Sequence, residues 1–186
     1  MRIYDRQYDQ EIGKANLKTL HYGKEVVNFA DVANPTEIER LEIGFCNVKD
    51  LTGIACLRGL RQIHIHYCRM LEDISHIEDL HTLVQINLFS LPKVEINLNV
   101  TKLPNLKSLS YTTVNGLLTI RGIDELTQLT HLGLSRAKVQ DEDYSPIVRS
   151  KSLKRVFWVG APFERPALQE LRKLRPDIII GGNAYN

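Results

Sequence analysis

The apolar residues between Leu57 and Met70 follow two different spacings. Leu57 and Leu60 are three positions apart, whereas Ile63 and Ile65 alternate with polar residues. Alternation with a period of two is typical of a strand that buries one face, and a spacing of three does not fit such a strand. The stretch therefore predicts a descending segment that leads into a short strand, which is one turn of a solenoid.

The same alternating pair recurs along most of the chain. The first residues of successive pairs lie 22, 23, 23, 23 and 24 residues apart. The six pairs are Leu41-x-Ile43, Ile63-x-Ile65, Ile86-x-Leu88, Leu109-x-Tyr111, Leu132-x-Leu134 and Val156-x-Trp158. A period of this length predicts stacked structural repeats, each of which contributes one strand to a common parallel sheet.

An apolar ladder precedes each pair, as Leu103 and Leu106 precede Leu109, and a small or apolar residue follows it. Five positions after the first strand residue stand Cys46, Cys68, Leu91, Val114, Ala137 and Ala161. Over residues 35–164 this pattern resembles the leucine-rich repeat family, in its class of roughly 22 residues per repeat, L-x-x-L-x-x-L-x-L-x-x-(N/C)-x-L. The resemblance implies an α/β fold: a right-handed solenoid with a concave parallel sheet of short strands.

Only Cys46 and Cys68 keep the Asn or Cys that the family places where the chain leaves the strand. A polar side chain there satisfies backbone groups of the turn, so these cysteines are expected to be structural. With Cys56 they make an odd number of cysteines in a chain without an apolar export signal, which favours reduced thiols.

Both ends of the chain depart from the repeat, and a solenoid needs caps over its exposed core. Residues 1–34 predict an N-terminal cap, with a hairpin of strands over 17–22 and 25–29 around Gly23. Residues 165–186 predict a C-terminal cap, with a helix over 167–174 behind Pro166 and a last strand over 177–180.

Charge and hydropathy exclude several classes of partner. The chain has 24 basic and 22 acidic residues, and a formal charge of +2 does not supply the positive field that nucleic-acid binding uses. No stretch approaches the roughly 20 apolar residues of a membrane helix, and the first residues lack a signal peptide. We therefore expect a soluble, cytoplasmic protein with no membrane or nucleic-acid partner.

The residues that flank each buried pair point outward from the predicted sheet and form columns across the repeats. Aromatic and imidazole side chains gather in the N-terminal repeats, and basic and aromatic ones in the C-terminal repeats. Exposed aromatics anchor protein interfaces, and basic residues suit carboxylates. The predicted partner-binding residues are Phe45, His64, His66, Tyr67, Phe89, His131, Arg136, Arg155 and Phe157.

Other interpretations of these residues stay open. Phe45 and Tyr67 could instead fold down onto their own turns. His64 and His66 alternate as metal ligands can, but no third ligand is evident, so neither a metal nor another cofactor is expected. A nucleophile beside a base and a phosphate-binding loop are also lacking, so an enzyme that uses His64, His66 and Tyr67 is the least favoured possibility.

The sequence therefore predicts a non-enzymatic module that binds another protein on its concave face. The resemblance extends to bacterial leucine-rich repeat proteins that act as immunity proteins, which implies an antidote that blocks a toxin domain. The alternative is a scaffold or adaptor that recruits a regulatory enzyme such as a phosphatase or a ligase.

Overall fold

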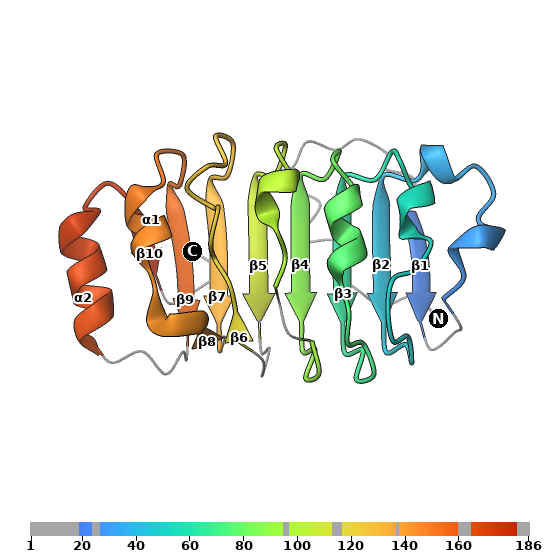
Figure 1. Cartoon of the computed structure of the whole chain (residues 1–186), viewed down its shortest axis with the longest axis horizontal. Helices are drawn as coiled ribbons and strands as arrows, with labels where there is room; N and C mark the ends of the chain where they lie inside the picture. The colour runs from blue at the N-terminus through green and yellow to red at the C-terminus, as the bar shows by residue number, and fades with distance from the viewer. Residues whose placement is uncertain are drawn as a thin grey trace.

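The computed structural model describes residues 19–23, 27–94, 97–112, 117–136, 138–159 and 165–181. Eight strands form one sheet in which all neighbours are parallel, and Figure 1 shows them side by side in chain order. They are β1 (Thr19–Gly23), β2 (Arg40–Gly44), β3 (Gln62–His66), β4 (Gln85–Phe89), β5 (Ser108–Thr112), β7 (His131–Ser135), β9 (Arg155–Val159) and β10 (Ile179–Gly181). The predicted solenoid with a parallel sheet is confirmed.

Each predicted alternating pair occupies the second and fourth positions of a five-residue strand. In β3 these are Ile63 and Ile65, and Ile63 lies opposite Leu41 on one side and Ile86 on the other. The same register continues through β9, so equivalent positions of successive repeats form straight columns across the sheet.

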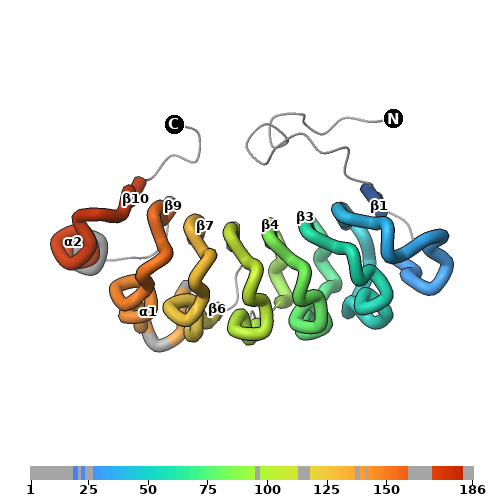
Figure 2. The backbone as a smooth tube through the Cα atoms, turned by 90° about the horizontal axis from the view of Figure 1, so that it is seen from above, coloured from blue at the N-terminus to red at the C-terminus, as the bar shows by residue number. Residues whose placement is uncertain are grey.

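The chain returns between strands through short helical segments on the other face of the sheet. Figure 2 shows the sheet along the inner side of an arc and these segments along its outer side. They are 3₁₀ helices at Phe29–Asp31, Pro35–Glu37, Ile54–Cys56, Ser75–Asp79, Val100–Lys102 and Gln140–Glu142, and the helix α1 (Ser145–Arg149). The two-residue strands β6 (Leu117–Leu118) and β8 (Lys138–Val139) form a second small sheet.

The core lies between the sheet and the returning segments. The paired strand residues and the ladder leucines are buried, as Leu57, Leu60, Leu103 and Leu106 show with 0% exposure. Burial of these side chains removes apolar surface from water in every repeat, which stabilises the stack repeat by repeat. Tyr111 is buried with them.

The turns that follow β2 and β3 use their cysteines as predicted. The Cys46 thiol donates to the carbonyl oxygens of Gly44 at 3.4 Å and Tyr22 at 3.5 Å, and the Cys68 thiol donates to that of His66 at 3.5 Å. Burial raises the pKa of Cys68 to about 11, so the thiol stays protonated at neutral pH. The corresponding positions Val114, Ala137 and Ala161 lie outside the described residues.

A second kind of turn was not predicted from the repeat pattern. Asp50 and Asp73 each accept a hydrogen bond from the backbone N–H two residues later, at 2.8 Å, and Asp143 does so at 3.0 Å. These Asp-x-Ser/Thr turns lead the chain into the outer segments. The bonds hold the pKa of each of these carboxyls below its usual range.

The N-terminal cap differs from the predicted hairpin. Thr19–Gly23 pairs in parallel with β2, residue for residue, and thus extends the sheet by one strand. Residues 25 and 26 of the predicted return strand lie outside the described residues. In its described part, Val27 and Asn28 are outside any strand, and Phe29 begins a 3₁₀ helix that the Asn28 side chain caps. By pairing with β2, Thr19–Gly23 occupies the backbone groups along that edge of the main sheet, which a separate hairpin would leave unpaired.

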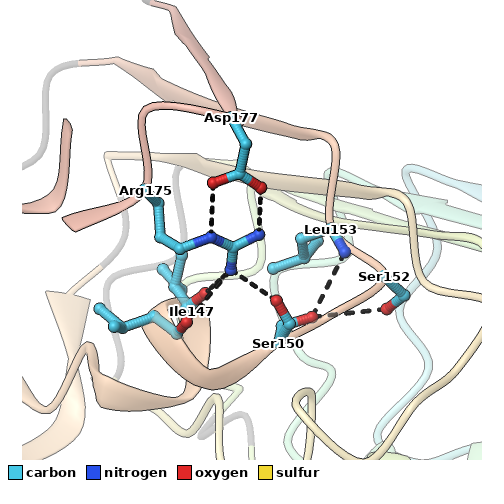
Figure 3. A network of polar contacts seen from close by, with 7 residues as sticks. Ile147, Ser150, Ser152, Leu153, Arg175 and Asp177 are labelled. Atoms are coloured by element: carbon cyan, nitrogen blue, oxygen red, sulfur yellow. Dashed lines mark hydrogen bonds and ion pairs between the residues drawn. The ribbon is translucent and has the colours of Figure 1, made fainter. Parts of the chain in front are cut away.

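At the other end, α2 (Arg165–Leu174) is followed by β10, where the sequence predicted a helix over 167–174 and a strand over 177–180. Arg175 joins this segment to the last repeat: its guanidinium donates to the backbone oxygens of Ile147 at 2.9 Å, Val148 at 3.1 Å and Ser150, and to both carboxylate oxygens of Asp177 (Figure 3). These carbonyls end α1, where no further helical N–H is available to them. Within the described residues, no helix combines the length and apolar character needed to cross a bilayer.

Candidate functional site

The turns that follow β2, β3, β4 and β7 each place one residue at the rim of the concave face. Phe45, Tyr67, Ser90 and Arg136 stand at this position, and all four have positive φ, between 51° and 59°. The N–H of Phe45 still donates to the carbonyl of His66 on the next strand, at 3.0 Å, and the positive φ of residue 45 then turns the chain away from the strand direction. Gly, Asn or Asp adopt the conformation at lower cost than an aromatic residue does.

The aromatic side chains meet across neighbouring strands. The Phe45 and Tyr67 rings are stacked with centroids 4.9 Å apart, and Tyr67 meets Phe89 edge to face at 5.0 Å. Phe45 and Tyr67 are 45% and 42% exposed. The rings therefore contact one another across the strands and remain accessible to a partner. They are not folded onto their own turns, which was the alternative interpretation.

The rings of Phe45, Tyr67 and Phe89 form a row, which is called the aromatic row below. Behind it, His64 and His66 stack on each other with ring centroids 4.8 Å apart. His66 differs from the expectation of an exposed contact residue, because it is only 6% exposed. Its ring lies over Gly44, where the lack of a side chain leaves room, and it touches Phe45 edge to face at 5.4 Å. His66 thus supports the aromatic row from below.

Glu42 is the acidic group nearest to the imidazoles. Its carboxylate lies 3.5 Å from Nε2 of His66, and both side chains are largely buried. Burial, followed by the neighbouring His66, lowers the pKa of His64 to about 4. At neutral pH His64 is therefore an uncharged ring, which can donate one hydrogen bond and accept another.

A hollow of about 310 Å³ opens beside these rings on the concave face. Its floor and walls come from β2 to β5. The residues that line it are Arg40, Glu42, Gln62, Ile63, His64, His66, Tyr67, Gln85, Asn87, Leu88, Phe89, Ser110 and Thr112. Four of the nine predicted residues, His64, His66, Tyr67 and Phe89, thus meet at one site, and Phe45 adjoins it through its stacked ring.

The remaining predicted residues form a separate group on β7 and β9. His131 and Arg155 are exposed neighbours in register, and the half-buried Phe157 lies opposite Gly133. Arg136 is exposed at the rim, one residue beyond β7. The strand β5, whose Ser110 and Thr112 form the edge of the hollow, pairs directly with β7, so this group adjoins the hollow on that side.

Sequence reasoning had not selected the polar residues of the hollow. Arg40, Gln62, Gln85 and Asn87 stand in the same outward columns as the predicted residues, and the strand register alone would have found them. Gly44 was missed as well, because its role depends on the ring that covers it from the next strand.

The chemistry of the site is that of a binding surface. Within the described residues, no group of three or more His, Cys, Asp and Glu side chains could hold a metal ion. Neutral imidazoles, carboxamides and aromatic rings offer hydrogen bonds and apolar area to a ligand.

No protein-family model matches the chain, and no curated protein sequence matches it. Among solved structures it is similar to an internalin from Listeria monocytogenes, with 17% sequence identity and a TM-score of 0.40, over 89% of this chain and 62% of that chain. It is also similar to a leucine-rich repeat protein from Leptospira interrogans, with 17% identity and a TM-score of 0.38, over 78% of this chain and 55% of that chain. The chain thus spans less than two thirds of the length of both structures.

The repeat itself gives the classification. A period of 22 to 24 residues, a five-residue strand in every repeat and buried leucine ladders behind one curved parallel sheet occur together. These features identify the fold of the chain as a leucine-rich repeat solenoid.

Proposed function

We propose that this chain is a non-enzymatic module that binds another protein on its concave face, chiefly over β2, β3 and β4. One observation carries the proposal: three aromatic rings from three successive repeats meet in a partly exposed row at the rim of a hollow. Large accessible apolar groups beside a concave polar site are the usual anchors of protein recognition.

The row is held in place before a partner arrives. Phe45 and Tyr67 stack on each other, and His66 supports both rings from its place over Gly44. A ring that is already fixed loses little conformational entropy on binding, so more of its contact energy appears as affinity. The cost of placing aromatic residues in a left-handed turn also fits a role outside folding.

The hollow would receive one or two side chains of the partner. Its volume of about 310 Å³ is at the lower end of the range for small-ligand sites. Gln62, Gln85 and Asn87 line its floor with amide donors and acceptors, and the neutral His64 adds another of each. An apolar side chain that ends in a polar group would satisfy both kinds of surface.

The partner that we propose is a toxin domain, which this protein would occlude as an intracellular antidote. Support for this finer role is the resemblance of the chain, as a small leucine-rich repeat protein, to the bacterial proteins of this kind that act as immunity proteins. Occlusion needs a rigid face and no catalysis, which agrees with the chemistry of the site. A regulatory enzyme held by an adaptor is the competing partner, and the experiment below separates the two.

The test begins with affinity capture from the source cells and titration of the purified captured protein. Replacing Phe45, Tyr67 and Phe89 together with alanine should weaken binding by about 3 kcal/mol or more, a factor of at least about 100. Leu174→Ala is the matched control, because Leu174 is 56% exposed on α2, away from the hollow. Equal affinity of the triple variant and the control, with unchanged circular dichroism, would contradict the proposal.

Co-expression then distinguishes the two roles. If the captured protein is toxic when expressed alone, the wild-type chain should restore growth and the triple variant should not. A captured phosphatase or ligase that keeps its activity in the complex would favour the adaptor.

A further inference from the structure

The outward positions of the sheet are unequally charged along its length. Acidic and basic residues are nearly equal in the whole chain, 22 against 24. From β3 through β9, however, the outward columns contain no Asp or Glu among the described residues, whereas Arg136 and Arg155 both lie there. The acidic residue of these columns, Glu42, stands on β2 against His66.

Arg136 and Arg155 differ from the ion-paired arginines Arg149 and Arg175. Arg149 is paired with Asp124 at 2.8 Å and Arg175 with Asp177 at 2.7 Å. Neither Arg136 nor Arg155 has a carboxylate partner within the described residues, and both are exposed. From β3 through β9 no other Asp, Glu, Lys or Arg stands in the described outward columns, so both guanidinium groups are available to carboxylates from outside the chain. Arg40 and Glu42 lie farther away, on β2.

The two arginines stand at opposite ends of neighbouring strands, with an aromatic ring between them. Arg155 begins β9, Phe157 is its central residue, and Arg136 follows the last residue of β7. Phe157 lies opposite Gly133, so no neighbouring side chain on β7 covers it. Five residues at about 3.3 Å each separate the two ends, which gives about 16 Å along the strand direction.

We propose that the partner meets this half of the face with an acidic polypeptide segment in which two carboxylates flank an apolar residue. The carboxylates would pair with Arg136 and Arg155, and the apolar residue would cover Phe157. An extended segment of about five residues spans the distance. This inference rests on the proposed function and adds the chemistry of the partner, beyond the aromatic anchor over β2 to β4.

The same surface fits a nucleic acid less well. A nucleic-acid backbone carries closely spaced phosphates and is bound by clusters of Lys and Arg. Here the outward side of β5, with Ser108, Ser110 and Thr112, has no cation, and Glu42 borders the neighbouring hollow. A protein segment with two separated carboxylates matches two separated cations.

A random peptide display library tests the inference without knowledge of the natural partner. It is selected in parallel on the immobilised full chain, on the double variant R136A/R155A, and on the triple variant F45A/Y67A/F89A. Arg58→Ala is the matched control, since Arg58 is an exposed arginine outside the strand columns. Enriched peptides are synthesised and their affinities measured at low and at physiological salt.

We expect peptides with two acidic residues around an apolar one, bound about tenfold more weakly by R136A/R155A than by R58A. Enriched peptides that lack an acidic excess but need the aromatic row would overturn this inference and leave the proposed function standing. If the wild-type chain enriches no peptide at all, both the inference and the proposed function are contradicted. If acidic peptides bind the triple variant as well as the wild type but bind R136A/R155A more weakly, the inference stands and the role of the aromatic rings is contradicted. A labelled single-stranded oligonucleotide is the second probe, and binding that R136A/R155A removes would overturn the inference in favour of nucleic acid.

Discussion

The imidazole of His66 occupies the space that a side chain at Gly44 would need. A Cβ atom at residue 44 would lie 2.2 Å from Nε2 of His66, well inside contact distance. The two residues are register partners on β2 and β3. Because residue 44 has no side chain, the His66 ring can lie buried against the sheet. From this position it contacts the rings of Phe45 and Tyr67.

Gly44→Ala should therefore destabilise the protein by about 1–3 kcal/mol, because overpacking forces the buried ring to move. Urea denaturation measures the change. Gly181→Ala is the control, since no atom lies within 4 Å of a Cβ at that glycine of β10. The double variant G44A/H66A should recover most of the loss. If it is as unstable as G44A alone, the clash with His66 is not the cause.

Ser90→Gly should stabilise the protein by about 1 kcal/mol, because Ser90 has a φ of 53° and glycine adopts this conformation without strain. Phe45→Gly relieves the same strain but loses the stacking contact with Tyr67, so its net gain should be smaller or absent. Thermal unfolding of both variants checks the order. An equal gain at the two positions would mean that the stacked rings contribute nothing to folding.

His64 should make the protein less stable in acid. Its pKa is lowered from 6.5 to about 4 in the folded chain, so between these values the unfolded chain binds a proton that the folded chain does not. Stability is greatest above pH 6.5 and falls by up to about 3 kcal/mol as the pH drops toward 4. Urea denaturation of wild type and His64→Gln across this range isolates the effect. An NMR titration midpoint of His64 near 6.5 would refute it.

Tyr111→Phe should stabilise the protein by about 1 kcal/mol. The Tyr111 hydroxyl is buried and has no hydrogen-bond partner among the described residues, and burial raises its pKa. Removal of an unsatisfied buried polar group eliminates its desolvation cost. The comparison is Tyr67→Phe, whose ring is 42% exposed and whose change should stay within about 0.5 kcal/mol. A loss of stability in Tyr111→Phe would show that the hydroxyl is hydrogen-bonded, for instance to a water molecule.

Arg175→Ala should cost about 2–3 kcal/mol, because it leaves the carbonyls of Ile147, Val148 and Ser150 without their donor. Arg175→Lys should recover little, since an ammonium group lacks the planar fork that also holds Asp177. Arg172→Ala is the control, because Arg172 makes one exposed bond, to the Ile180 carbonyl at 3.2 Å. Near-equal stability of R175A and R172A would show that the bonds from Arg175 to the α1 carbonyls do not stabilise the protein.

Much of the fold could be predicted because its information is local and repeated. Every repeat has the same pattern of apolar residues. A strand that is assigned wrongly in one repeat can therefore be corrected by comparison with the others. The strand positions, such as Ile63 and Ile65, and the structural role of Cys46 and Cys68 were found in this way. The hairpin was expected from local signals alone, whereas Thr19–Gly23 pairs with β2, since the sequence outside the repeat does not specify which backbone partner a strand meets.

The site could be predicted only in part, for a similar reason. The columns placed His64, Tyr67 and Phe89 together, since a common register is a property of the repeat. The burial of each side chain depends on the size of its neighbour on the next strand. The spacing of the repeats does not specify that size. His66 was therefore expected at the surface and lies buried.

The amino-acid sequence by itself determined the class of fold, the number and register of the repeats, and the faces on which leucine and aromatic residues lie. Periodicity suffices for these, because each repeat buries its apolar residues against its neighbours in the same way. Only the tertiary structure decided that His66 packs over Gly44 and that the rings of Phe45 and Tyr67 stack. It also decided that the pKa of His64 is lowered, so that the ring is uncharged at neutral pH. These features depend on contacts between side chains about 22 residues apart, and on the exclusion of water where those contacts close.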